Sequence, residues 1–219
     1  MGRRPHFSPA LQALEHQQLL KRLAETQAEL HRLGGLLVKA RECERAAHHL
    51  AYQDSLTALP NRRAFLHRLD EALARSAAHE CHLAVLFIDL DNFKHINDTH
   101  GHHVGDQLLA TVGRRLAQGV RATDMVARLG GDEFACLLLH TAPMADVGQV
   151  ATKLFHRIAA PVTLGALCLQ VKPSIGIAVC PKGKSMAVEQ LLNSADRAMF
   201  HAKRSRSGHH LINGAASAE

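Results

Sequence analysis

Hydrophobic residues in the first quarter of the chain recur with a helical period. Residues 8–50 contain no proline after Pro9, and leucines at 23, 30 and 37 are spaced by seven. The partner positions of this stripe are also mostly apolar, with Thr26 interrupting it; they are Leu19, Leu33, Ala40 and Ala47. This repeat predicts a coiled-coil seam, and the alternative is an amphipathic helix packed on its own domain. Gly34 and Gly35 each cost about 1 kcal/mol relative to alanine and favour a kink or break.

The stretch 54–63 interrupts the helical pattern with capping residues and Pro60, so it marks the start of the main domain. Apolar residues at helical spacing then predict helices over 62–78, 107–120, 144–159 and 188–204. Short apolar runs predict strands over 83–89, 125–127, 134–139, 162–171 and 174–179. The polar segment 91–106 is expected to form a loop or a short helical turn.

This order of elements indicates the α+β class: a central, mostly antiparallel sheet flanked by helices and preceded by an N-terminal helix. We divide the chain into a helical segment over residues 1–50, a main domain over 51–208 and a flexible tail over 209–219. A length of 219 residues suits one well-buried domain plus an extension, and 47% hydrophobic with 21% charged residues is ordinary for a globular protein.

Charge and composition narrow the function classes. The net charge of +6 favours an anionic partner, but much of the excess lies near the two ends, so we expect no nucleic-acid-binding face. The five cysteines are widely spaced and mostly lie within apolar stretches, as expected for core residues in a reducing compartment. We expect no membrane span and no signal peptide, and hence a cytoplasmic protein, because no apolar run approaches about 20 residues and the basic N-terminus lacks an apolar segment.

The candidate chemistry gathers around residues 128–134, Arg-Leu-Gly-Gly-Asp-Glu-Phe, which lie between two apolar runs. This pattern predicts a β-hairpin whose tip carries Asp132 and Glu133. An ordinary turn with solvated charges is the alternative. A second acidic stretch, containing Asp89 and Asp91, lies upstream at the end of a predicted strand. Two acidic stretches that meet across a sheet would form a site for a hard cation such as magnesium.

Five segments in order resemble the GGDEF-domain diguanylate cyclases: residues 54–62, 87–98, 101–106, 128–134 and 174–178. The resemblance covers the chain from 54 to about 206 and implies a fold similar to the palm of nucleotide cyclases and polymerases. It also implies that a homodimer joins two GTP molecules into cyclic di-GMP and releases two pyrophosphates. The alternative is a degenerate member that binds GTP or cyclic di-GMP as a sensor without making it.

The same resemblance implies roles for individual residues. Asp89, Asp132 and the Leu90 carbonyl would hold two Mg²⁺ (or Mn²⁺) ions per active site, with Glu133 assisting them or contacting the attacking ribose. Arg128 would stabilise charge developing at phosphorus. The remaining expected substrate-binding residues are Asn97 and Asp106 for guanine, Lys94 and Lys203 for phosphates, and Phe93, His102 and Arg206.

Arg121 and Asp124 match the spacing of the family's product-inhibition motif, RxxD, where they would bind cyclic di-GMP; the alternative is a surface ion pair. Two positions depart from the family pattern. His100 stands where an aromatic residue is usual. Arg206 comes one place earlier than the arginine of the family's C-terminal helix, which leaves its phosphate contact open.

Overall fold

The computed structural model describes residues 9–79, 82–141, 144–181, 183–184, 186–205 and 209–213. The chain divides into two compact units, residues 1–49 and 50–219. Helix α1 (Pro9–Tyr52) makes up most of the first unit and continues through Gly34 and Gly35, so the expected break there is wrong. Both glycines are exposed, and a side chain at either would meet nothing, so they leave the helix intact at a modest energetic penalty. No described helix is long and apolar enough to cross a membrane.

The second unit is built on a five-stranded sheet in the order β2-β3-β1-β6-β7. Its strands are β1 (His82–Leu90), β2 (Met125–Gly130), β3 (Glu133–Thr141), β6 (Pro173–Cys180) and β7 (His209–Asn213). Neighbours pair antiparallel except β6 and β7, which are parallel. The central strand β1 is apolar along most of its length because both of its faces are covered.

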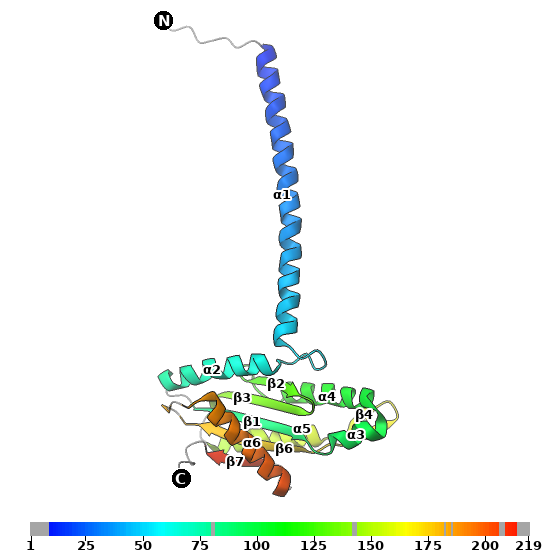
Figure 1. The fold of residues 1–219 in the computed structure, drawn as a ribbon, viewed down its shortest axis with the longest axis vertical. Helices are drawn as coiled ribbons and strands as arrows, with labels where there is room; N and C mark the ends of the chain where they lie inside the picture. Colours follow the sequence, from blue (N-terminus) through cyan, green and yellow to red (C-terminus); the bar gives the residue numbers. More distant parts are fainter. Residues whose placement is uncertain are drawn as a thin grey trace. The chain divides into compact units, whose positions relative to one another are not determined.

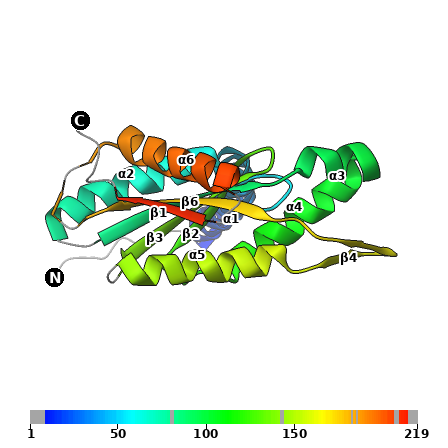
Figure 2. The same ribbon diagram turned by 90° about the horizontal axis from the view of Figure 1, so that it is seen from below.

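Helices cover both faces of this sheet (Figures 1 and 2). Helices α2 (Arg62–His79) and α6 (Val188–Ser205) pack on one face, in a cluster that contains Phe65, Val85 and Ala195. Helices α4 (His102–Ala117) and α5 (Met144–Ala159) pack on the other, in a cluster that contains Leu86 and Leu108. Successive side chains of β1 point alternately into these two clusters, and this alternation sets the face of the sheet on which the acidic side chain at the end of β1 lies. The predicted α+β class is confirmed.

Three predicted elements differ from the structure. The polar segment contains a full helix, α3 (Phe93–His100), and α4 begins at His102, because Asn92 turns the chain with φ 58° and Phe93 then anchors the new helix in the core. The predicted strand 162–171 is a hairpin of β4 (Val162–Leu164) and β5 (Leu167–Leu169), turning at Gly165 with φ 60°.

The C-terminal prediction also changes. Residues 209–219 were expected to form a flexible tail, but residues 209–213 form β7 on the edge of β6. The physical reason is that β6 would otherwise leave one row of backbone groups unpaired at the sheet edge. Residues 214–219 lie outside the described part of the chain.

Candidate active site

The β2–β3 hairpin forms as predicted and places its tip at the end of β1. Gly130 and Gly131 have φ values of 149° and 52°, which side-chain-bearing residues rarely adopt. Asp132 follows at the turn, and Glu133 pairs with Asp89 across β1 and β3. The sheet register therefore brings the two acidic stretches of the sequence together.

Lys203 of α6 reaches these acids. Its Nζ lies 2.6 Å from Asp89 Oδ1, and the Asp89 side chain is only 13% exposed. The hydrogen bond to Asp89 raises the pKa of Lys203; partial burial opposes this, and the charges of Asp89, Asp91 and Asp132 reinforce it. Lys203 is therefore a firmly charged ammonium at the centre of the acidic group.

The pKa values of both hairpin acids are raised, first by partial burial and then by neighbouring carboxylates. Partial burial raises the pKa of Asp132, and the negative charge of Asp89 adds to the shift. Partial burial also raises the pKa of Glu133, followed by repulsion from Asp89, Asp132 and Asp196. Added cationic charge would stabilise both ionised carboxylates.

The donor set fits a hard cation that is held partly by substrate. Among the described residues, no three His, Cys, Asp or Glu side chains converge into a complete metal cluster. Asp89, Asp132 and the Leu90 carbonyl supply only oxygen donors. Mg²⁺ commonly binds through one or two carboxylates and completes its shell with water and substrate phosphates, so this incomplete set suits it.

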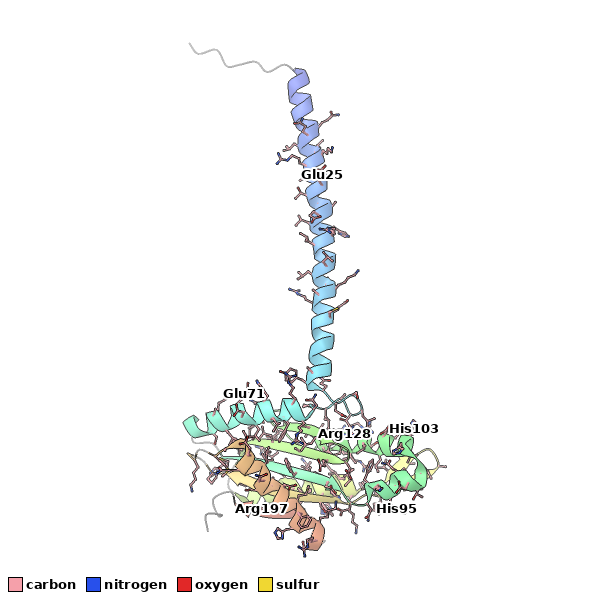
Figure 3. All side chains as sticks on the ribbon, viewed as in Figure 1. Glu25, Glu71, His95, His103, Arg128 and Arg197 are labelled. Atoms are coloured by element: carbon pink, nitrogen blue, oxygen red, sulfur yellow. The ribbon has the colours of Figure 1, made fainter. Side chains whose placement is uncertain are left out.

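Arg128, which is labelled in Figure 3, makes structural contacts that the sequence did not predict. Its Nε and one terminal nitrogen donate to the Gly131 carbonyl at 3.0 and 2.8 Å. The other terminal nitrogen donates to both Asp54 carboxylate oxygens, at 3.1 and 3.2 Å. The guanidinium, with its side chain 12% exposed, thus ties the hairpin tip to the segment that follows α1. We call this arrangement of Asp54, Arg128 and the Gly131 carbonyl the hairpin clamp.

Asp54 is the site residue that the sequence did not reveal, since it marked a domain boundary and the start of a family segment but received no role of its own. Its Oδ1 also accepts from the backbone N–H and hydroxyl of Thr57, at 2.9 and 2.7 Å. Partial burial alone would raise the pKa of Asp54, but the hydrogen bonds from Thr57 and then the contact with Arg128 outweigh it, and the pKa is lowered. The spacing of Asp54 and Thr57 is a local signal for such a turn, but nothing local indicates Arg128.

The predicted guanine-binding residues lie on the two helices beyond β1. Asn97 is half-buried on α3, and Asp106 is exposed on α4. Lys94 and His102 are exposed, as substrate contacts require, whereas the Phe93 side chain is only 8% exposed and packs in the core. Phe93 therefore has a packing role in the core, and its contact with substrate stays a prediction.

A cavity of about 790 Å³ lies between this end of the sheet and α3. Its lining includes Lys203, Lys172 and His95, together with Asp91, whose carboxylate accepts a hydrogen bond from the Ser174 hydroxyl at 2.8 Å. His95 is labelled on α3 in Figure 3. The cavity offers positively charged groups and space beside the acidic end of β1.

The predicted product-inhibition residues lie just before β2, where Arg121 is exposed. The Asp124 carboxylate accepts from two backbone N–H groups, those of Leu139 at 3.1 Å and Arg121 at 3.0 Å. These bonds fix the Asp124 side chain, while the carboxylate retains lone pairs for a further donor. Arg206 lies outside the described residues.

Comparisons with known proteins identify relatives of this chain. The chain is 44% identical over 161 residues to the diguanylate cyclase TpbB of Pseudomonas aeruginosa, covering 73% of this chain and 37% of TpbB. It is 45% identical over 154 residues to the bifunctional diguanylate cyclase/cyclic di-GMP phosphodiesterase MucR of the same species, covering 70% of this chain and 22% of MucR. The chain thus spans well under half the length of these curated relatives.

The fold comparison reaches further into α1. The structure of the coiled coil and GGDEF domain of DgcB from Caulobacter crescentus, in complex with c-di-GMP, matches with a TM-score of 0.73 at 27% identity. The match covers 89% of this chain and 98% of that one. Residues 51–209 match the family described as "Diguanylate cyclase, GGDEF domain". This chain therefore belongs to the GGDEF-domain family of diguanylate cyclases.

Proposed function

We propose that this chain is an active diguanylate cyclase that joins two GTP molecules into cyclic di-GMP and releases two pyrophosphates. The observation that carries the proposal is the gathering of Asp89, Asp132 and Glu133 beside Lys203 at one end of the sheet. A domain that only binds nucleotide has no need for the raised pKa values of Asp132 and Glu133, which come from partial burial and from neighbouring carboxylates, because perturbed acids of this kind are typical of catalytic sites.

The reaction needs little covalent chemistry from the protein. The 3′-oxygen of one GTP forms a bond to the α-phosphorus of the other. The bond from that phosphorus to the oxygen that bridges the α- and β-phosphates breaks, pyrophosphate leaves with this oxygen, and the 3′-hydroxyl proton passes to water. A second such transfer closes the ring. Asn97 and Asp106 would hold the guanine, and Lys94 and Lys203 would contact the phosphates.

Asp89, Asp132 and the Leu90 carbonyl would hold Mg²⁺ or Mn²⁺, two ions in each active site. When bound, the metal supplies charge that stabilises the phosphates and favours attack at phosphorus. Glu133 lies close enough to Asp89 and Asp132 to share that positive charge. Because the hairpin clamp holds the tip, Arg128 acts first as a positioning residue. It would stabilise charge at phosphorus only if its guanidinium left Asp54 and the Gly131 carbonyl.

Two active sites must face each other, because each domain would present one GTP. Helix α1 supports a homodimer, since its leucines stay exposed: Leu19 65%, Leu23 55%, Leu30 65%, Leu33 50% and Leu37 53%. Apolar side chains repeating at heptad spacing are stabilised when a second helix covers them. Sedimentation of the full chain would give twice the chain mass.

We further propose that cyclic di-GMP inhibits the enzyme at Arg121 and Asp124, since a guanidinium and a fixed carboxylate suit a guanine nucleotide. Arg121→Ala should keep turnover within about twofold and lose inhibition by added cyclic di-GMP. Initial rates at rising product concentration would measure this. Inhibition equal to that of the native protein would reject the site.

The proposed function is tested directly by incubating the full chain with GTP and Mg²⁺ and separating the products. Cyclic di-GMP and pyrophosphate should form in a 1:2 ratio and cease to form when a chelator removes the metal. Binding of GTP at equilibrium without product would instead indicate the sensor alternative.

A further inference from the structure

Helices α3 and α4 are tightly packed at a residue to which the family resemblance gave no role, Gly105. Gly105 is buried in the first turns of α4 and faces Asn97 of α3. A Cβ at position 105 would lie 1.8 Å from Asn97 Oδ1, 3.0 Å from Asn97 Cγ and 3.1 Å from Phe93 Cζ. Only glycine leaves room for the Asn97 amide as it is placed.

The Asn97 amide has a defined orientation at this contact. Its Oδ1 is buried and has no hydrogen-bond partner in the described part of the chain. A buried acceptor without a donor destabilises a protein by about 1–3 kcal/mol, so such groups are rare away from functional sites. Because the amide is planar, an oxygen turned toward Gly105 leaves the NH₂ end, Nδ2, facing away from that contact.

We propose that Gly105 is a positioning residue for purine recognition, which holds the Asn97 amide so that Nδ2 donates to O6 of guanine. The inference rests on the proposed function, in which Asn97 and Asp106 read the base. The neighbouring Asp106 carboxylate accepts from the N1–H and 2-amino groups. Adenine carries a 6-amino donor where guanine has O6, so the fixed Nδ2 opposes it.

Gly105→Ala should displace the amide and weaken GTP binding by about 5–150-fold, the equivalent of one buried hydrogen bond lost. ITP also carries O6 and should lose the same factor, whereas the weak binding of ATP should not change. Isothermal titration with non-hydrolysable analogues measures these affinities without turnover. Gly148→Ala in α5, where an added Cβ meets nothing within 4 Å, is the matched control for a helical glycine.

A double-mutant cycle separates positioning from simple packing. In the Asn97→Ala background the amide is gone, so adding Gly105→Ala should cause no further loss of GTP affinity. The contact at 1.8 Å is removed and Phe93 Cζ at 3.1 Å needs to move by only a few tenths of an ångström, so the double variant should fold even if the single one does not. A further loss in that background would overturn the inference, as would unchanged GTP and ITP affinity in Gly105→Ala. If the native chain binds no GTP, the proposed function fails and this inference fails with it.

Discussion

The two sides of the β2–β3 hairpin tip contrast in how their charges are satisfied. On one side, the hairpin clamp pairs Arg128 with Asp54 and the Gly131 carbonyl, and hydrogen bonds outweigh burial to lower the pKa of Asp54. On the other, Asp132 and Glu133 lie beside Asp89, and burial and repulsion raise the pKa of both hairpin acids. The same short loop thus has one side on which hydrogen bonds stabilise the charged groups, which we call the satisfied side, and one on which burial and repulsion destabilise the ionised carboxylates, the unsatisfied side.

The hairpin clamp explains how the tip can keep the mutually repelling carboxylates of Asp132, Glu133 and Asp89 close together. Like charges brought together push a flexible loop apart, and an isolated two-residue turn with glycine at its centre has little stiffness of its own. The clamp supplies that stiffness from a distant segment, so Asp132 and Glu133 can stay close to Asp89 before a cation and phosphates bind. The side with the clamp thus stabilises the tip, and the side with Asp132 and Glu133 supplies the proposed chemistry.

Asp132→Asn gives the largest expected effect on the acidic side. Loss of one carboxylate donor should lower kcat by about 10³-fold, similar to the loss of a key electrostatic contact in other enzymes. The fold should remain, and without divalent cation the melting temperature should rise, because a repelling charge is gone. Product formation from GTP and a thermal melt measure the two effects.

The control for this variant is Asp70→Asn, which removes an exposed carboxylate from α2. It should change neither activity nor melting temperature measurably. Full activity in Asp132→Asn would contradict the metal role of Asp132 and would move the chemistry away from the hairpin.

The hairpin clamp is tested by a double-mutant cycle with Asp54→Asn and Arg128→Gln. Each single change should lower the free energy of unfolding by about 1–3 kcal/mol, since each leaves a poorly solvated partner with fewer hydrogen bonds. Arg128→Gln should cost more, because it also releases the Gly131 carbonyl. Urea unfolding of both single variants and of the double variant would give the coupling free energy.

The clamp should also affect turnover, by about tenfold, because a looser tip places Asp132 less accurately. If the two single changes were additive in stability, the side chains would not act as a pair. Unchanged turnover in both variants would show that the acids need no support from the clamp.

The sequence predicted those parts of the site that depend on local pattern. The apolar runs around Gly130 and Gly131 predicted the hairpin, and the strand ending in Asp89 predicted its partner across the sheet. Helix α3 was missed because its polar residues hid the spacing of Phe93 and Ile96, which pack inward. The clamp was missed for a different reason: Asp54 and Arg128 are 74 residues apart, and only the folded sheet brings them together.

The resemblance to a family named the expected substrate residues but could not say what holds them. It gave Asn97 a role, whereas the space that Gly105 leaves for it depends on how α3 and α4 cross. It assigned Arg128 to the phosphorus, whereas the folded chain engages it with Asp54. Residue types and their order were enough to predict the chemistry of the site, whereas the positions of its side chains depend on packing in the folded chain.

The smallest expected effect is an opposite pH dependence of stability on the two sides. The raised pKa values of Asp132 and Glu133 mean that the native state binds protons more readily than the unfolded state, so their contribution to stability falls as the pH rises through those pKa values. The lowered pKa of Asp54 means that its contribution is present above the unfolded pKa of about 3.9 and is lost as the pH falls through the folded value.

Thermal melts from about pH 2 to 7, without divalent cations, would separate these contributions. The stabilisation of Asp132→Asn relative to the native chain should grow as the pH rises, by about 1–3 °C, because only the native chain gains a repelling charge. The destabilisation of Asp54→Asn should shrink as the pH falls, because the native carboxylate loses its charge too. Parallel pH profiles for the two variants would mean that the sides of the tip are electrostatically alike, and the division between a satisfied and an unsatisfied side would not stand.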